Sequence, residues 1–323
     1  MIPVSVIMTV LNEAQDIERG VASLLALDPP AAEVVVVDGG SSDGTWEKLT
    51  EIARRDARLV PIRDETCSLK HSAGPISRGR NVAITAAKSD VIACADAGCS
   101  YAPDWLLNLT SSIIAGSAEY ALGGSYLDPA AHTIWDVASA PFFSIKLSPS
   151  KPQKSCTARS MAFTKNLWER IGGFPEGVFL GEDTLFDFAA RQHAHPDFVA
   201  NAKAIYRPGN SFAQASRQMA RYAYSDGLAR VRGGRLVRHA ARSVLQVAAL
   251  VSLRWSAIPF LAVVLIELAF ALKKDARFLL PFGAKAVAAR IVFSLAVPWI
   301  VTVNQLKGLF SAAPAPNRQN SGN

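Results

Sequence analysis

Acidic side chains follow two strand-like segments of this sequence. Asp38 comes directly after the valine run Val34–Val37, and Asp96 comes directly after Val91–Ala95. Open α/β sheets bind their ligands beyond the carboxyl ends of parallel strands, so both carboxylates are candidates for ligand contacts. Such an edge can bind the base and ribose of a nucleotide through carboxylates, and its diphosphate through a metal ion and cationic side chains. For Asp38 alone, capping of the following turn is an equally good interpretation.

A second acidic pair, Glu182 and Asp183, opens a predicted helix whose buried stripe is expected to be Leu185, Phe188 and Ala189. Acids in the first turn of a helix interact favourably with its dipole. Taken by itself, the pair is better explained by this structural role than by a functional one.

Strands and helices alternate around these acids. Residues rich in β-branched side chains predict strands at 4–10, 34–37, 59–62 and 91–95. Apolar periodicity predicts helices from Asn12, at 45–55, at 74–88 and after Pro103, and Thr9, Asn12 and Glu13 lie at the first switch from strand to helix. This order predicts an α/β fold with a doubly wound sheet. The absence of a GxGxxG or P-loop pattern argues against dinucleotide and Walker-type phosphate binding.

The positive charge of the chain is concentrated in one region. The chain has 323 residues and a net charge of +7, and residues 217–242 contain seven arginines but one acid, Asp226. Within this region Gln218, Arg221 and Tyr222 share one face of a predicted helix, because their spacing is i, i+3, i+4. A solvated basic face explains most of the other arginines. Because the most apolar part of the chain follows, we expect an anionic membrane surface as the partner and no nucleic acid.

Two apolar stretches follow the basic region. Residues 255–272 are apolar except for Glu267, and residues 278–303 contain Lys285 and Arg290. Insertion of at least 255–272 is favoured, and helices lying in the membrane plane are the alternative, because Lys273–Arg277 between the stretches opposes a simple hairpin. The predicted organisation is a doubly wound domain at 1–210, basic interfacial helices at 211–242, membrane-associated helices at 243–305 and a disordered tail at 306–323.

The cysteines and the N-terminus predict the compartment. The four cysteines show no CxxC or zinc-type spacing and are expected to be reduced, mostly buried thiols. The chain opens almost at once with a strand, and no secretory signal is expected. The predicted location is the cytoplasmic face of the cell membrane, with integral or peripheral attachment through 243–305.

Taken together, these motifs resemble the inverting family-2 glycosyltransferases of GT-A fold, in their membrane-associated bacterial type. The resemblance covers about residues 3–225. It is carried by Thr9-Val-Leu-Asn12-Glu13, Val37-Asp38-Gly-Gly-Ser-Ser-Asp43-Gly-Thr45, Gly79-Arg80-Asn81, Asp96-Ala-Gly98, Gly172-Gly-Phe-Pro-Glu176, Glu182-Asp183 and Gln218-x-x-Arg221-Tyr222. In the last motif, tyrosine stands where the family usually has tryptophan.

The resemblance implies a donor-binding role for several residues. Glu13 and Asp38 would hold the base and ribose of a UDP- or GDP-linked sugar, with Thr9 and Asn12 shaping the same pocket. Arg80 would lie near the diphosphate. Asp43 is assigned instead to the helix cap and turn.

The resemblance also implies the residues that carry out transfer. Asp183 matches the catalytic base, which would take the proton of the acceptor hydroxyl, and Glu182 beside it is predicted as a second catalytic residue. Gln218, Arg221 and Tyr222 would contact the diphosphate or the acceptor. The acceptor would be a saccharide or a polyprenyl-linked saccharide in cell-envelope or exopolysaccharide synthesis.

The metal site departs from the family pattern. Asp96 matches the first acid of the family's Asp-x-Asp, which contacts the ribose and the metal, but Gly98 replaces the second acid. A divalent cation, Mg²⁺ or Mn²⁺, could still be held by Asp96, the diphosphate and water. The alternatives are a nucleotide-sugar-binding protein without catalysis, which Gly98 favours and Asp183 opposes, and a nucleotidyltransferase, for which the first loop lacks the glycine-rich basic signature.

Overall fold

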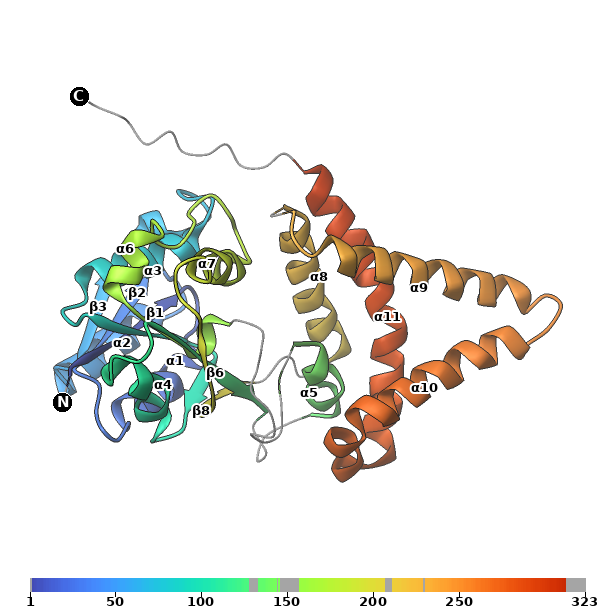
Figure 1. Cartoon of the computed structure of the whole chain (residues 1–323), viewed down its shortest axis with the longest axis horizontal. Coiled ribbons are helices and arrows are strands. Elements are labelled where there is room, and N and C mark those ends of the chain that lie inside the picture. Colours follow the sequence, from blue (N-terminus) through green and yellow to red (C-terminus); the bar gives the residue numbers. More distant parts are fainter. Residues whose placement is uncertain are drawn as a thin grey trace. The chain divides into compact units, whose positions relative to one another are not determined.

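The computed structural model describes residues 2–127, 133–143, 145, 157–206, 211–228 and 230–311, except for the side chains of 270–278. These residues form two compact units (Figure 1). Unit 1 contains the described residues up to 126 together with 157–206. Unit 2 contains the described residues of 127–147 together with 211–311. Most of the predicted tail, residues 312–323, lies outside the described part.

The described part of unit 1 is built on one eight-stranded sheet. Its order is β3-β2-β1-β4-β7-β6-β8-β5. The strands are β1 (Val4–Val10), β2 (Glu33–Asp38), β3 (Leu59–Arg63), β4 (Val91–Asp96), β5 (Cys99–Tyr101), β6 (Tyr120–Tyr126), β7 (Met161–Thr164) and β8 (Asp197–Tyr206). The first four strands are parallel, which confirms the predicted half of the fold. β7 pairs antiparallel with β4, an extension that the sequence pattern did not predict.

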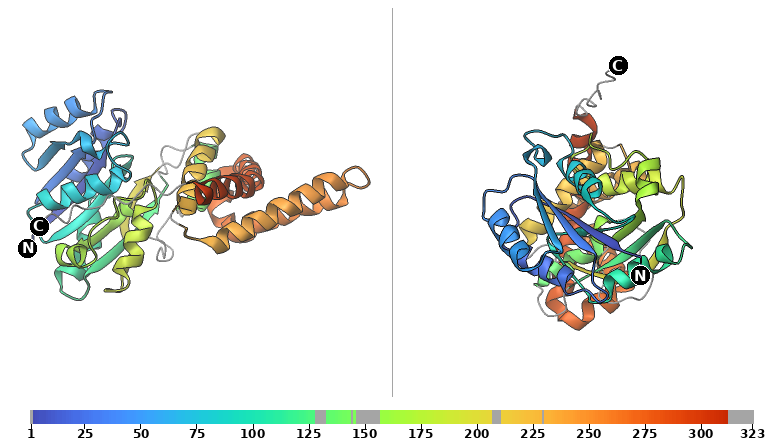
Figure 2. Two further views of the ribbon diagram at one scale, coloured as in Figure 1. Left: turned by 90° about the horizontal axis from the view of Figure 1, so that it is seen from above. Right: turned by 90° about the vertical axis from the view of Figure 1, so that its left-hand side faces the viewer.

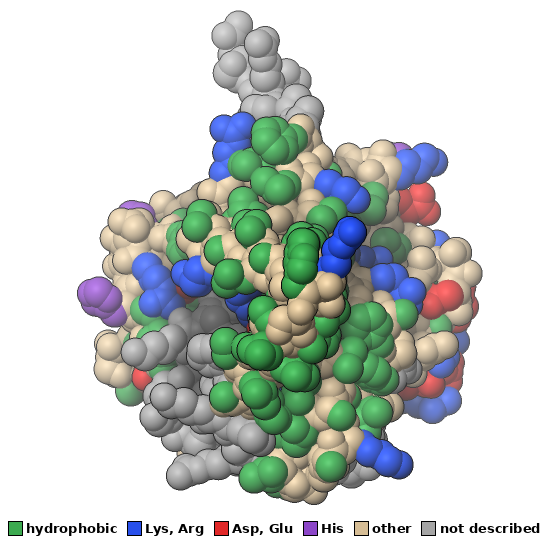
Figure 3. All heavy atoms as spheres, turned by 90° about the vertical axis from the view of Figure 1, so that its right-hand side faces the viewer, with side chains coloured by type: hydrophobic (Ala, Val, Ile, Leu, Met, Phe, Trp, Pro, Cys, Tyr) green, Lys and Arg blue, Asp and Glu red, His purple; other side chains and the backbone are tan. Residues whose placement is uncertain are grey.

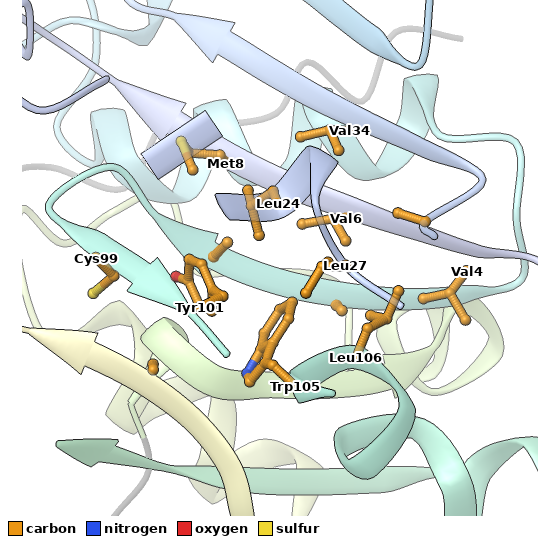
Figure 4. Close-up of a cluster of buried hydrophobic side chains, with 14 of the residues drawn as sticks. Val4, Val6, Met8, Leu24, Leu27, Val34, Cys99, Tyr101, Trp105 and Leu106 are labelled. Atoms are coloured by element: carbon orange, nitrogen blue, oxygen red, sulfur yellow. The ribbon is translucent and has the colours of Figure 1, made fainter. Parts of the chain in front are cut away.

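Helices cover both faces of this sheet (Figures 1 and 2). One face carries α1 (Ile17–Leu25), α2 (Thr45–Arg55) and α4 (Trp105–Ile114), and the other carries α3 (Pro75–Ala86), α6 (Lys165–Arg170) and α7 (Glu182–Ala190). Val34 and Val36 of β2 pack in the first layer, and Val35 and Val37 in the second. The valine run is therefore buried on both faces, as predicted. Figure 4 shows the first layer closing around the buried Trp105.

Two local predictions about helices were wrong. The helix expected to open at Asn12 begins at Ile17, because Asn12 adopts a left-handed backbone conformation with φ +56°. In α7, Phe188 is exposed and the buried stripe is Glu182, Phe186 and Ala190. The inward position of Glu182 sets the rotation of α7, since residues four and eight positions later share its face.

Unit 2 is helical in its described part. Its elements are α5 (Ile134–Ser139), η2 (Ala140–Phe143), α8 (Phe212–Leu228), α9 (Gly233–Ser252), α10 (Ile258–Leu279), η4 (Leu280–Phe282) and α11 (Gly283–Phe310). α8 and α11 pack backbone against backbone: a Cβ on Gly227 would lie 2.1 Å from the Gln305 carbonyl oxygen, and one on Gly308 would lie 2.0 Å from that of Tyr224. α9 runs across the boundary predicted at 242, and α11 extends five residues into the predicted tail.

One helix of the described residues has the length and apolar composition to cross a membrane. It spans Leu280–Phe310, and the described side chains of α10 give a shorter apolar segment, Ile258–Ala269. Of the stretch expected to insert, 255–272, the first three residues lie in the α9–α10 loop and residues 258–272 belong to α10; insertion stays a prediction.

Candidate active site

Asp38 ends β2 as a fully buried carboxylate. Its Oδ1 accepts hydrogen bonds from the backbone N–H groups of Gly40 at 2.9 Å and Ser41 at 2.7 Å. Its Oδ2 is buried without a hydrogen-bond partner among the described residues. One oxygen therefore caps the turn, and the other is an acceptor that a ligand hydroxyl or N–H could satisfy, since buried polar atoms normally find partners.

The loops after β1 and β2 are bonded to each other through Asn12. Its backbone N–H donates to Ser41 Oγ at 2.8 Å, and its Oδ1 accepts from the N–H of Ser42 at 2.9 Å. Asn12 was predicted to shape the nucleotide pocket, and these contacts place it between the two loops that border the buried Asp38.

Asp43 belongs to the same loop framework. Its carboxylate accepts from the N–H and hydroxyl of Thr45, the first residue of α2, and from the N–H of Ala14. These bonds, above all the one from the Thr45 hydroxyl, lower the pKa of Asp43. Its predicted role in the turn is confirmed, whereas the N-cap position of α2 is occupied by Gly44.

Glu13 lies half-buried beside other acids. Burial, followed by the charges of Asp16, Asp96 and Asp43, raises the pKa of Glu13. A ligand that brings hydrogen-bond donors or positive charge to this place would relieve the repulsion between these carboxylates.

Arg80 links two elements that are distant in sequence. Its side chain, 5% exposed, donates from Nη1 to Glu182 Oε1 at 2.6 Å and from Nη2 to Asp96 Oδ1 at 3.2 Å. The guanidinium also lies 5.3 Å from the ring centre of Phe174. Burial alone would lower the pKa of Arg80, but Glu182 and Asp96 raise it above its ordinary value. Arg80 was expected near a diphosphate, and the structure places it in a buried ion-pair cluster that joins β4 to α7.

Gly181, with φ +82°, precedes α7, and Glu182 and Asp183 are the first two residues of the helix. The Asp183 side chain is half-buried, and its Oδ1 accepts from the N–H of Thr184 at 2.7 Å. Glu182 is buried instead, and this burial, opposed by Arg80, raises its pKa. The two neighbouring acids therefore differ: Glu182 anchors the helix to Arg80, and Asp183 keeps access to solvent.

Arg159 is a site residue that sequence reasoning missed. Its Nε lies 3.9 Å from Asp96 Oδ2, and its guanidinium lies over the ring of Tyr206 at 4.0 Å from the centre. Asp96 thus lies between two guanidinium groups. Arg159 lies just before β7, and the antiparallel pairing of β7 with β4 brings it to the end of β4, next to Asp96. Because the sequence pattern did not predict this pairing, it could not identify Arg159 as a site residue.

Asn81 holds the glycine-rich turn against α3. Its Oδ1 accepts from the N–H of Phe174 at 2.9 Å and from Trp168 Nε1 at 3.1 Å, and its Nδ2 donates to Phe174 O and Glu176 Oε1. Gly172 and Gly173 adopt positive φ after α6, as the helix end predicts. This motif supports Arg80 through Phe174 and does not itself supply a reacting group.

We expect Gly79→Ala to disturb the site through packing. A Cβ at Gly79 would lie 2.7 Å from Thr9 Cγ2, so α3 must move away from β1 and carry Arg80 with it. The expected loss is about 1–3 kcal/mol of unfolding free energy. Thr9→Ser removes that methyl group, so the double variant should recover much of the loss in chemical denaturation. Equal stability of Gly79→Ala and wild type would contradict the close approach.

The cysteines near the site are inert. Cys94 and Cys99 are free and buried, and burial raises the pKa of each thiol to about 12. The thiolate needed for nucleophilic attack is therefore scarce at neutral pH. Cys67 is also free and buried, and Cys156 lies outside the described residues.

A family model described as glycosyl transferase family 2 matches residues 5–172, about half of the chain. The chain belongs to the family-2 glycosyltransferases. The matched region contains the loops after β1 and β2, the Arg80 cluster except for Glu182, and Asp96.

Two curated relatives of this glycosyltransferase are named as a glycosyltransferase and as a polysaccharide biosynthesis protein. It is 27% identical over 188 residues to the glycosyltransferase AglE of Haloferax volcanii, covering 56% of this chain and 58% of AglE. It is 32% identical over 119 residues to the succinoglycan biosynthesis protein ExoA of Rhizobium meliloti, covering 35% of this chain and 33% of ExoA. The alignments thus span less than two thirds of either relative.

Solved structures confirm the GT-A fold. The mannosyltransferase PcManGT from Pyrobaculum calidifontis, in complex with GDP-Man and Mn²⁺, aligns with a TM-score of 0.58 and 20% identity over 96% of this chain and 88% of that one. S. aureus TarS 1–349 in complex with UDP-GlcNAc aligns with a TM-score of 0.50 and 20% identity over 92% and 91%.

The remaining predicted residues of this glycosyltransferase lie on α8 in unit 2. Arg221 is exposed, Gln218 is half-buried, and the ring of Tyr222 packs edge-on against Phe143 at 5.7 Å between centres. Their contact with a diphosphate or an acceptor stays a prediction.

The described residues do not fit a resident divalent metal ion. No cluster of three possible His, Cys, Asp or Glu ligands occurs in the described part of the chain. Asp96 supplies one carboxylate, and Arg80 and Arg159 already balance its charge. Most ligands of a cation here would have to come from a bound diphosphate and water.

Proposed function

We propose that this glycosyltransferase moves a sugar from a UDP- or GDP-linked donor to a hydroxyl of a saccharide or polyprenyl-linked acceptor, with inversion at the anomeric carbon. The names of the relatives support a role in cell-envelope or exopolysaccharide synthesis. The observation that carries the proposal is the bridge from Asp96 through Arg80 to Glu182, because it joins the donor-binding strand ends to the helix that bears Asp183.

The chemistry needs one proton acceptor. Asp183 takes the proton from the acceptor hydroxyl while that oxygen forms a bond to the anomeric carbon. The bond from the anomeric carbon to the diphosphate oxygen breaks, and the nucleoside diphosphate leaves with the electron pair. Glu182, beside Asp183 in the same turn, serves as the anchor that fixes where the base stands.

The donor lies at the ends of β1, β2 and β4. The free Oδ2 of Asp38 and the carboxylate of Glu13 accept hydrogen bonds from the base and ribose, in the pocket that Thr9 and Asn12 border. The carboxylate of Asp96 contacts the ribose, and Arg80 and Arg159 orient this carboxylate. Gln218, Arg221 and Tyr222 remain proposed contacts of the diphosphate or the acceptor.

We expect Gly98→Asp to create the missing second acid. A Cβ at Gly98 would meet only Tyr206 Cε2, at an ordinary 3.8 Å, so an aspartate has room there. Two carboxylates should bind Mn²⁺ more tightly than Asp96 alone, by about tenfold or more. Titration of the donor-bound protein with Mn²⁺ measures this. Gly98→Asn, of the same shape but uncharged, is the control, and an equal gain in that variant would contradict a carboxylate effect.

A thermal-shift screen tests the proposal. Nucleoside diphosphates and their sugars are added to the full chain with and without Mg²⁺ or Mn²⁺, since a ligand of the native state raises the melting temperature with its concentration. A shift by UDP or GDP compounds, lost in Asp38→Asn, is expected. No shift by any of them would overturn the donor assignment.

Release of nucleoside diphosphate separates catalysis from binding. With the donor identified by the screen, saccharide and polyprenyl-linked acceptors are supplied, and release that depends on the acceptor supports transfer. Donor binding without release would favour the alternative, a nucleotide-sugar-binding protein.

The chain is proposed to work at the cytoplasmic face of the cell membrane. The basic residues of α8 and α9 and the apolar helix Leu280–Phe310 support this location. Polyprenyl-linked acceptors would be found at that surface.

A further inference from the structure

In unit 2, the segment from Ser243 to Glu267 buries polar side chains and exposes large apolar ones. Ser243, Gln246 and Glu267 are buried. Between Val244 and Ile266, the exposed large side chains of these helices and their loop are apolar except for Arg254: Val244, Leu245, Val247, Leu250, Val251, Leu253, Trp255, Ile258, Leu261, Leu265 and Ile266. Figure 3 shows hydrophobic side chains gathered on the face towards which the α9–α10 loop points. A helix pair facing water has the opposite arrangement.

The buried Glu267 is bonded within unit 2, whereas the side-chain amide of Gln246 is buried without a hydrogen-bond partner among the described residues. Glu267 of α10 accepts from Arg242 of α9 and from the hydroxyl of Ser294 in α11. Arg290 of α11, also buried, lies over the ring of Phe142 at 4.1 Å from the centre. In proteins whose outer surface faces lipid, charged side chains typically turn towards the interior of the helix bundle and pair there.

Arginines flank this apolar surface at both ends. Between 243 and 266 the only charged residue is Arg254, in the α9–α10 loop, and it is followed by the 77% exposed Trp255. At the other end, residues 230–242 carry five arginines and no acid. Arginine is attracted to anionic lipid headgroups, and tryptophan prefers the boundary between headgroups and acyl chains.

The two helices are too short to cross the bilayer. The part of α9 from Ser243 to Ser252 is about 15 Å long, and the α10 residues 258–272, which are apolar in sequence except for Glu267, are about 22 Å long, at 1.5 Å per residue. The hydrocarbon core needs about 30 Å. α11 is long enough, but its backbone contacts with α8 at Gly227 and Gly308 would take the charges of α8 into the hydrocarbon with it.

We propose that the α9–α10 hairpin docks unit 2 on an anionic bilayer as an interfacial module that crosses nothing. The outward apolar side chains enter one leaflet, and Arg254 and Trp255 lie at the headgroup level. This inference rests on the proposed membrane location and names the surface that makes the contact.

Vesicle binding by the full chain tests the proposal. Sedimentation is measured with vesicles of phosphatidylcholine containing 30% phosphatidylglycerol and with pure phosphatidylcholine. Leu245→Glu should lower partitioning into anionic vesicles by about tenfold or more. The matched control is Leu69→Glu in unit 1, where the leucine is 60% exposed against 63% for Leu245. The depth of Trp255 in the bilayer is measured by quenching with brominated lipids. The Trp255 signal is the fluorescence that the wild type has and Trp255→Phe lacks.

The expected result is preference for anionic vesicles, loss in Leu245→Glu only, and stronger quenching by shallow than by deep bromines. Four results overturn docking: no partitioning, equal loss in Leu69→Glu, stronger deep quenching, or dimer formation that Leu245→Glu abolishes without vesicle binding. Donor thermal shifts are recorded on the same proteins in detergent. A chain that binds donor but ignores vesicles overturns docking and leaves the proposed transfer intact.

Discussion

Asp183→Asn should abolish sugar transfer while donor binding survives. The amide keeps the size and hydrogen-bonding shape of the carboxylate but cannot take the acceptor proton at neutral pH. A positioned general base contributes about 10²–10⁴-fold, so single-turnover transfer should fall by that factor. The donor-dependent thermal shift should stay within the error of the wild type, because Asp183 lies on α7 and the donor contacts proposed here lie at the ends of β1, β2 and β4.

The neighbouring acid supplies the comparison for this prediction. Glu182→Gln keeps a hydrogen bond to Arg80 and leaves Asp183 in place, so transfer should fall far less than in Asp183→Asn. Full transfer by Asp183→Asn would exclude Asp183 as the base. A larger loss in Glu182→Gln, with the thermal shift retained, would instead assign the base to Glu182.

Arg80→Ala should be the most destabilising single change in the site. It leaves the buried Glu182 carboxylate without its partner and Asp96 without one of its two cations. Removing one member of a buried ion pair costs about 3–5 kcal/mol of unfolding free energy. Donor affinity should fall as well, because Arg80 orients Asp96. Chemical denaturation and the donor-dependent thermal shift measure the two effects.

Arg78, in the same helix, is the matched control. Its ion pair with Glu176 is 3.3 Å long, and both side chains are more than a third exposed. Such surface pairs contribute about 0–1 kcal/mol, so Arg78→Ala should cost little. In the Arg80→Ala background, Glu182→Gln should recover stability, because the unpaired buried charge is removed. Equal losses for Arg78→Ala and Arg80→Ala would refute the buried cluster.

The local sequence predicted the parallel half of the fold well. A run of valines such as Val34–Val37 favours a strand that is buried on both faces, and β2 has this conformation and burial in the structure. The turn role of Asp43 was predictable for the same reason, since its partners Thr45 and Ala14 belong to the two loops that the strand order brings together.

Predictions failed where a distant partner decides the conformation. The rotation of α7 depends on Arg80, 102 residues before Glu182, and no local pattern could show that Phe188 would face solvent. Arg159 reaches Asp96 only because β7 joins β4 antiparallel. In unit 2, α5 joins helices that follow only after the unit 1 segment 148–206.

By itself, the sequence determined the family, the α/β order and the acids at the strand ends, because these depend on residue type and short spacing. The tertiary structure alone decided how the acids divide their tasks. Asp38 is half turn cap and half free acceptor, and Glu182 is an anchor while Asp183 stays accessible. That division arises from burial and from the pairing of charges across long sequence separations, neither of which a linear pattern records.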